Sequence, residues 1–118
     1  MEQVFQTLEK VKETLFAQTK NKIKLYYEKY PVHLQGKKNS TTYELCLKTE
    51  DLPHFKYRFM FIEYLENDFP ILLDIDEDIA VQLKINHSMF CNTAEELEMI
   101  LQKIENSEKF KRVIKKLM

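Results

Sequence analysis

Glycine and proline are scarce in this sequence, which holds one glycine and three prolines among 118 residues. Because these residues mark turns and breaks in regular structure, their scarcity predicts a chain that is mostly helix and strand. Two cysteines, Cys46 and Cys91, are too few for a disulfide framework. We interpret both as reduced, packed thiols of a cytoplasmic protein.

Long apolar runs are absent as well. No stretch of eighteen apolar residues occurs, so we expect no membrane-spanning helix and no membrane partner. Residues 1–12 form an amphipathic pattern, without a positively charged start followed by an apolar run, and we expect no signal sequence.

The composition that remains is that of a globular protein, with 44% hydrophobic and 31% charged residues, and the length predicts one domain over residues 1–118. The net charge of −1 hides an asymmetry. Residues 1–60 hold eleven Lys and Arg against seven Asp and Glu, residues 61–105 hold two against eleven, and residues 106–118 hold five against one. An acidic middle between basic ends argues against a uniformly basic nucleic-acid surface.

Helical periodicity marks both ends of the chain. Residues 2–19 have apolar side chains at helical spacing and predict an amphipathic helix. Near the C-terminus, Thr93 with Glu96 three residues later forms a capping-box pattern, and Ser107 resembles a second N-cap. The apolar stripe from these caps to the end predicts either one kinked helix or two helices in sequence.

Strand patterns fill the middle of the chain and are separated by turn residues. One of these turns is GKKNS, at residues 36–40. Pro31 and a change of apolar face mark the first as a bulged edge strand. The short connections favour an antiparallel meander. The predicted fold is therefore α+β, a four- to five-stranded antiparallel sheet with an N-terminal helix and a C-terminal helix pair packed on one face. The predicted strands are residues 23–34, 41–50, 55–66 and 71–76, with 80–85 as a candidate fifth.

The third predicted strand, FKYRFMFIEYLE, has two unlike faces. Its odd-numbered side chains are aromatic and are expected to face the helices. Its even-numbered side chains are polar at first and apolar from residue 60 onward. If the turn after this strand sets a register that gathers apolar residues on one face, with Ile62 opposite Asp74, the even face becomes an aromatic and aliphatic patch with a charged rim, as in protein interfaces. We predict this patch as the partner-binding site, made of Arg58, Met60, Ile62, Tyr64 and Leu72.

An alternative interpretation of that patch is that the protein covers it with its own chain. The segment NHSMFCN, residues 86–92, is predicted to be a loop and contains Met89 and Phe90, which could fold over the even face. A helix that crosses this face would cover it in the same way. In that case the apolar face is part of the core, and no partner is needed to cover it.

Catalytic and metal-binding patterns are weak. In DIDEDIA, residues 74–80, the first acidic positions of a calcium loop are present, but Ile79 stands where that loop needs glycine and Ile85 where it needs a carboxylate. A solvated turn or a charged strand edge is the favoured interpretation. The three histidines lie on separate elements, and no nucleophile has a local signature. We expect no catalytic residue, no metal ligand and no cofactor, and predict that the protein is not an enzyme. A metal-dependent hydrolase built on Asp74, Asp76 and Lys84 is kept as a third interpretation.

A nucleic-acid interpretation is the alternative function. Residues 59–64 are similar to the aromatic strand of RNA-recognition motifs, although Arg58 replaces the glycine of that motif. The end of the C-terminal helix is rich in Lys and Arg, and these side chains can contact phosphates. The same pattern is also typical of the solvent-exposed side of an amphipathic helix. The candidate nucleic-acid residues are Lys37, Lys38, Lys109, Lys111, Arg112 and Lys115.

The order of helix, antiparallel strands and helix resembles small uncharacterised bacterial proteins, through DFPILLDID, TAEELEMILQKI and SEKFKRVIKKL. More distantly it is similar to type III secretion chaperones, which are small dimers that bind extended partner segments and have a helix between their third and fourth strands. The resemblance to the bacterial proteins transfers no active site, and the resemblance to the chaperones implies a dimer that binds partner segments. We therefore predict a non-enzymatic protein-binding module, either a homodimer or a chaperone- or adaptor-like protein, that uses its sheet face.

Overall fold

The computed structural model describes residues 2–32, 34, 36, 40–64 and 69–118. The helices are α1 (Glu2–Gln18), α2 (Glu77–Leu83), α3 (Ala94–Glu105) and α4 (Glu108–Leu117). The strands are β1 (Ile23–Tyr30), β2 (Thr41–Thr49), β3 (Tyr57–Tyr64), β4 (Ile71–Ile75) and β5 (Ser88–Cys91).

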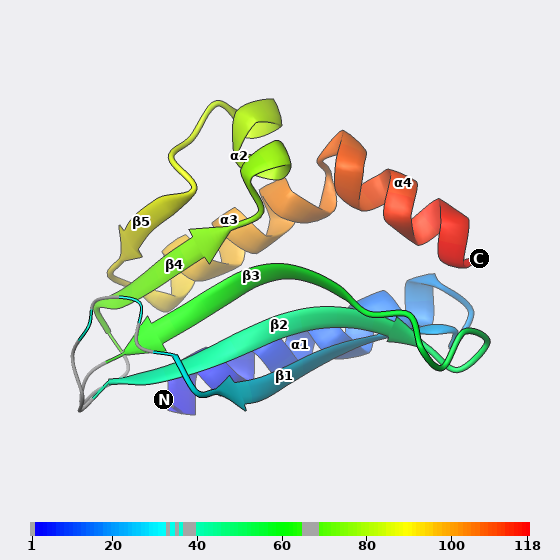
Figure 1. The fold of residues 1–118 in the computed structure, drawn as a ribbon, viewed down its shortest axis with the longest axis horizontal. Coiled ribbons are helices and arrows are strands. Elements are labelled where there is room, and N and C mark those ends of the chain that lie inside the picture. The colour runs from blue at the N-terminus through cyan, green and yellow to red at the C-terminus, as the bar shows by residue number, and fades with distance from the viewer. Residues whose placement is uncertain (1, 33, 35, 37–39, 65–68) are drawn as a thin grey trace.

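The strands form one open sheet in the order β1-β2-β3-β4-β5, and every neighbouring pair is antiparallel. In Figure 1, α1 and α3 lie side by side behind the sheet, and α4 continues beyond the end of α3. The predicted α+β meander is thus confirmed. The packing of the helices on one face holds for α1 and α3, whereas α4 contacts mainly α2 and α3.

Both C-terminal helices begin where the sequence predicts. The Thr93 hydroxyl accepts a hydrogen bond from the Glu96 amide at 3.1 Å, and the Ser107 hydroxyl accepts one from the Phe110 amide at 3.4 Å. Each hydroxyl satisfies an amide that the first turn of a helix leaves without a partner. The Glu96 carboxylate accepts from the Asn92 amide at 2.9 Å, one residue earlier than in a standard capping box. The C-terminal stripe therefore forms two helices rather than one kinked helix.

Residues 80–85, the candidate fifth strand, belong instead to α2 and the turn that follows it. Asp76 caps this helix, because its carboxylate accepts a hydrogen bond from the Asp78 amide at 2.9 Å. Lys84 ends the helix in the left-handed conformation, at φ 59°. Val81, which a half-buried strand would point inward, is 76% exposed. The fifth strand of the sheet is β5, within the segment that the sequence predicts to be a loop.

Strand β3 contains a bulge that exchanges its two faces. Leu45 of β2 lies opposite Met60, but the next residue, Cys46, lies opposite Arg58, so that Phe59 is an extra residue in β3. One extra residue shifts the alternation of side chains by one position. Every side chain beyond the bulge therefore points to the face opposite to the one that simple alternation predicts.

The expected aromatic core face of β3 is thus correct before the bulge and wrong after it. Tyr57 and Phe59 lie on the core side, where Phe59 meets the Phe110 ring of α4 edge to face at 5.3 Å. Phe61 lies on the other side, and Met60 takes the core position next to the bulge. Phe55 precedes the strand and is 37% exposed. These residues lie over a core shared with α1 and α3, to which the helices contribute Val4, Leu8, Leu15, Leu97, Leu101 and Ile104.

Strand β1 forms an edge of the sheet, as predicted, but without a bulge. Its register to β2 runs regularly from Ile23 opposite Thr49 to Tyr30 opposite Thr42. The change of face that the sequence shows around Pro31 falls after the last residue of the strand. The irregularity predicted for the first strand is found in β3 instead.

Candidate functional site

The sheet face turned away from α1 and α3 is the candidate site, and we call it the outer face. In Figure 1 it lies in front, and none of the helices crosses β1, β2 or β3 there. Directly opposed residues of antiparallel strands point to the same side, so the register assigns the side chains of this face. They are Lys24, Tyr26, Glu28, Tyr30, Thr42, Glu44, Cys46, Lys48, Arg58, Phe61, Glu63, Leu72, Asp74, Ser88 and Phe90.

Arg58 occupies the middle of the outer face, between two aromatic rings. Its guanidinium carbon lies 4.6 Å from the centre of the Phe61 ring and 5.4 Å from that of the Tyr30 ring, and the two rings meet edge to face at 5.0 Å. The Glu44 carboxylate, on the neighbouring strand, lies 3.3 Å from the Arg58 guanidinium and 2.5 Å from the Lys56 ammonium. We call Tyr30, Arg58 and Phe61 the aromatic–arginine cluster.

Glu44 anchors this cluster. It is only 5% exposed, and its burial acts to raise its pKa. The hydrogen bonds from Lys56 and Arg58 outweigh that effect and hold the pKa of Glu44 below its ordinary value. Glu44 is therefore ionised at neutral pH and fixes one side of the guanidinium, while the Arg58 side chain remains 43% exposed. A contact group fixed in advance loses little conformational entropy when a partner binds.

Towards β1, Tyr26 and Lys48 continue the outer face, with the ammonium 4.5 Å from the ring centre. Cys46 lies opposite Tyr26 and is 2% exposed. Burial, together with the charge of Glu44, raises the pKa of the Cys46 thiol to about 11, and burial raises that of Cys91 to about 11. Both thiols are therefore protonated at neutral pH and are poor nucleophiles.

Towards β5, the outer face ends in Phe90, which is 60% exposed and lies opposite Leu72. Leu72 in turn lies opposite Glu63, which is 1% exposed. The Glu63 carboxylate accepts hydrogen bonds from the Ser40 hydroxyl at 3.2 Å and the Thr42 hydroxyl at 3.4 Å. The exposed apolar area at this end of the face is thus that of Phe90.

The predicted partner-binding patch does not exist as a unit. Arg58 and Leu72 lie on the outer face, but Met60 and Ile62 are 1% and 0% exposed within the core. Tyr64 is half-buried and packs against the same core. The assignment of Met60, Ile62 and Tyr64 to a partner surface is therefore wrong, because the bulge turns all three towards the helices.

The register assumed from the sequence is wrong by one residue. It placed Ile62 opposite Asp74, whereas Ile62 lies opposite Leu73 in the structure. A shift of one residue moves every side chain to the other face. The signal that could have revealed this is the apolar pair Phe59-Met60, two consecutive residues that are both buried. The residues that sequence reasoning missed are Tyr26, Tyr30, Phe61 and Phe90.

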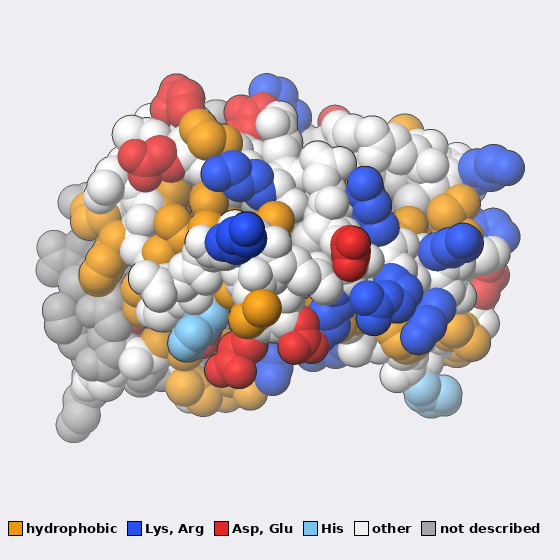
Figure 2. Space-filling view, turned by 90° about the horizontal axis from the view of Figure 1, so that it is seen from above, with side chains coloured by type: hydrophobic (Ala, Val, Ile, Leu, Met, Phe, Trp, Pro, Cys, Tyr) orange, Lys and Arg blue, Asp and Glu red, His pale blue; other side chains and the backbone are white. Residues whose placement is uncertain are grey.

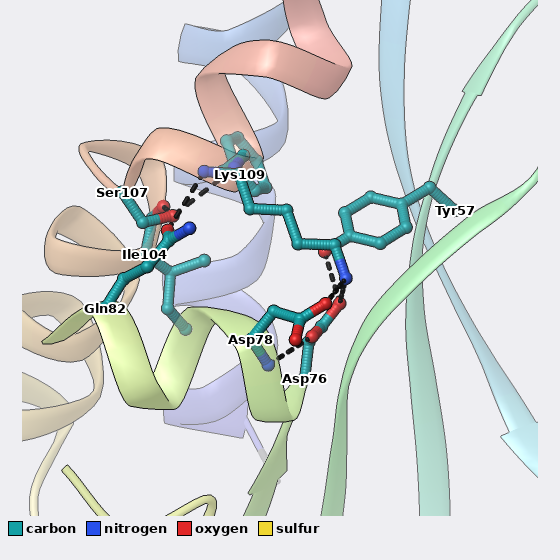
Figure 3. Close-up of polar contacts among 8 residues, drawn as sticks. Tyr57, Asp76, Asp78, Gln82, Ile104, Ser107 and Lys109 are labelled. Atoms are coloured by element: carbon teal, nitrogen blue, oxygen red, sulfur yellow. Dashed lines mark hydrogen bonds and ion pairs between the residues drawn. The ribbon is translucent and has the colours of Figure 1, made fainter. Parts of the chain in front are cut away.

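A second group of polar side chains joins β3, α2 and α4 (Figure 3). The Lys109 ammonium lies 2.7 Å from the Asp76 carboxylate and 2.8 Å from that of Asp78, and the Tyr57 hydroxyl donates to Asp76 at 2.6 Å. The Lys109 amide donates to the Gln82 side chain at 3.0 Å. Burial acts to raise the pKa of Asp76, but the hydrogen bonds from Lys109, Tyr57 and the Asp78 amide lower it below its ordinary value. We call this group the α2–α4 clamp.

The predicted nucleic-acid residues are divided among different environments. Lys109 is engaged in the α2–α4 clamp, and Lys37 and Lys38 lie outside the described residues. Figure 2 shows Lys and Arg side chains gathered over the half of the molecule that α4 occupies. The exposed cations of α4 are Lys111, Arg112, Lys115 and Lys116.

The acidic segment 74–80 is split between β4 and α2 rather than forming one loop. Asp74 faces the His87 ring, with 3.1 Å between its carboxylate and Nδ1, and Asp76 and Asp78 are held by Lys109. Within the described part of the chain, no three His, Cys, Asp or Glu side chains are grouped so that they could hold a metal ion.

Comparison of the chain with models of protein families, with curated proteins and with solved structures finds no match. The helices of the described residues include none with the length and apolar character needed to span a membrane.

Proposed function

We propose that this protein is a binding module, without catalytic activity, whose outer face takes a segment of another protein. The observation that carries the proposal is the aromatic–arginine cluster, which stands on a sheet face that no helix of the described residues covers. Aromatic side chains and arginine are enriched at the centres of protein interfaces and supply most of the residues that dominate binding energy.

The charges around the cluster favour a partner segment with apolar and acidic side chains. The outer face and its border carry four cations and the carboxylates Glu28, Glu44, Glu63 and Asp74, and two of the cations are paired with carboxylates at 3.8 Å. Glu44 is shared between Lys56 and Arg58, so this group of two cations and one carboxylate keeps one positive charge. An acidic side chain beside an apolar one would pair with that charge while its neighbour covers the Phe61 ring. The four cations are Lys24, Lys48, Lys56 and Arg58.

Site-specific photo-cross-linking tests the proposal. A benzophenone amino acid in place of Phe61 sits in the cluster, and the same amino acid in place of Val81, which is 76% exposed on α2, provides the matched control. In the native cell, we expect a single adduct of defined size at position 61 and none of that size at position 81. Mass spectrometry of the adduct then identifies the partner.

Two results would contradict the proposal. One is the absence of any adduct at position 61, and the other is the same set of adducts at positions 61 and 81, which indicates random encounters. A position on β5, Phe90, extends the test, because a partner that covers the outer face also reaches this exposed ring.

Nucleic-acid binding by α4 is the second candidate function. It is favoured by the exposed cations of this helix, for which the described residues offer no ion pair within 4.0 Å. If α4 binds phosphates, affinity falls steeply with salt, and the triple change of Lys111, Arg112 and Lys115 to Gln reduces both the affinity and the slope of that dependence. Binding that does not respond to the triple change excludes this role for α4.

A further inference from the structure

Strand β1 offers an edge of the sheet that pairs with no other strand among the described residues. Proteins usually protect long edges with a proline, a bulge or a charge that points inward. Over its eight residues β1 keeps a regular register, and Pro31 follows its last residue. Lys29, the charged residue on its core face, lies next to the end of the strand. The middle of this edge therefore has no proline, no bulge and no inward-pointing charge, and its charged side chains, Lys24 and Glu28, lie on the outer face.

The outer side chains of β1 are complementary to a second copy of the same strand. An antiparallel copy, related by a two-fold axis through Tyr26, would place Lys24 opposite Glu28 of the second copy, and Glu28 opposite Lys24 of the second copy. Opposite charges across neighbouring strands stabilise a sheet. In the single chain these two residues have only long, exposed pairs, Lys24 with Glu50 at 3.8 Å and Glu28 with Lys48 at 3.8 Å.

Helix α1 carries a stripe of side chains along the same edge. Phe5 stacks on the Tyr27 ring at 5.6 Å, and Glu9 accepts a hydrogen bond from the Tyr27 hydroxyl. Eleven residues beyond Phe5 along the helix, the centre of the Phe16 ring lies 5.5 Å from the Lys24 ammonium. Phe5 and Phe16 are both half-buried, and the Phe5 ring also meets the Tyr43 ring of β2 edge to face at 5.3 Å.

This stripe is also complementary to itself in antiparallel order. Lys12 lies on the same side of α1, and facing its own copy the stripe pairs Phe5 with Phe16 and Glu9 with Lys12. The midpoint of the stripe, between Glu9 and Lys12, lies behind the middle of β1. Tyr27 contacts the first half of the stripe, and the start of β1 contacts the second half. One two-fold axis therefore serves the strand and the helix together.

We propose that the protein forms a homodimer through β1 and α1, in which two sheets join edge to edge and the α1 stripe packs against that of the second copy. The dimer uses the edge of β1 and the cluster uses the outer face, and the two share only Tyr30, at the end of the strand, so the inference does not rest on the proposed binding of another protein. The joined sheet would place the outer faces of both copies on one continuous surface.

Sedimentation velocity with charge-reversed variants tests the dimer. Wild type is expected to sediment as a dimer at tens of micromolar, the range in which interfaces of modest strength assemble. Glu28→Lys is expected to raise the dissociation constant of the dimer about tenfold or more, because two attractive cross-strand pairs become repulsive. Its circular dichroism spectrum should match that of wild type, since the pair that it loses within one chain is exposed.

The double variant Lys24→Glu with Glu28→Lys restores opposite charges across the axis and is expected to recover the dimer. Phe61→Ser, on the outer face, is expected to leave the dissociation constant unchanged. A wild type that remains monomeric up to about 100 µM overturns the proposal. So does a Glu28→Lys dimer as tight as wild type, or a folded double variant that remains monomeric.

Discussion

The guanidinium carbon of Arg58 lies 4.6 Å from the centre of the Phe61 ring, and the two side chains share the outer face although they are three positions apart in the chain. In a regular strand, residues three apart point to opposite faces. The bulge at Phe59 brings them together, and the same shift buries Met60. The position of this single extra residue therefore decides which side chains of β3 can meet a partner.

The reversal of faces predicts opposite sensitivities for two neighbouring residues. Ile62→Ser removes a fully buried side chain and introduces a hydroxyl into the core, so we expect it to lower the free energy of unfolding by about 4 kcal/mol. Phe61→Ser, on the outer face, is expected to cost about 1 kcal/mol. Urea unfolding of both variants measures the difference. Equal losses, or a larger loss for Phe61→Ser, would show that β3 alternates without a bulge.

Glu44 is expected to link stability to pH. Its pKa is lower in the folded protein than in the unfolded chain, so its contribution to stability is present above the unfolded pKa and is lost as the pH falls through the folded pKa. Glu44→Gln should lower the free energy of unfolding by about 1–3 kcal/mol at neutral pH. The difference from wild type should shrink in acid. Glu50→Gln, at a 90% exposed side chain, serves as the control and should change little at either pH.

The α2–α4 clamp predicts that Asp76 matters and Asp78 does not. Asp76→Ala removes the N-cap of α2, the acceptor of the Tyr57 hydroxyl and one partner of Lys109, and should cost about 2–3 kcal/mol in total. Asp78→Ala removes an acid whose side chain is 73% exposed and should cost below about 1 kcal/mol. Chemical unfolding at neutral pH compares them, and similar losses would show that Lys109 is held by Asp78 instead.

The two cysteines are expected to be unreactive in the folded protein. Cys46 and Cys91 are 2% and 1% exposed, and burial raises the pKa of each thiol to about 11. Alkylation by iodoacetamide at pH 8 should therefore be slow and should rise sharply in denaturant, as measured by mass spectrometry. Rapid modification of either thiol without denaturant contradicts the packing described for β2 or β5.

Most of the fold could be predicted because local signals agree with it. The caps at Thr93 and Ser107, the alternation in β2 and the helical spacing in α1 each point to the structure found. Helix α2 could not be recognised from the sequence, because residues 80–85 have an apolar side chain at every second position, which is also the pattern of a strand. The deciding feature was the Asp76 cap with its left-handed end at Lys84, and the left-handed end leaves no mark in a sequence without glycine there.

The candidate site was harder to predict than the fold, because it depends on pairing between strands. The alternation of β3 gives the faces correctly up to Arg58, and the bulge then depends on how β2 aligns with it. The bulge leaves no apolar side chain of its own exposed, because the Phe59 ring packs against the Phe110 ring of α4. Phe110 lies 51 residues further along the chain. A contact of that kind cannot be read from the strand itself. Tyr30 joins the site for the same reason, through the register of β1 on β2.

The most direct test of the proposed binding surface is calorimetric titration of this protein with its purified partner, the protein that cross-links at position 61. Phe61→Ser and Arg58→Ala are each expected to raise its dissociation constant at least about tenfold, because both residues lie at the centre of the proposed interface. Val81→Ser, on α2, should bind as wild type does. If the partner binds Phe61→Ser, Arg58→Ala and wild type with the same affinity, the outer face is not the binding surface.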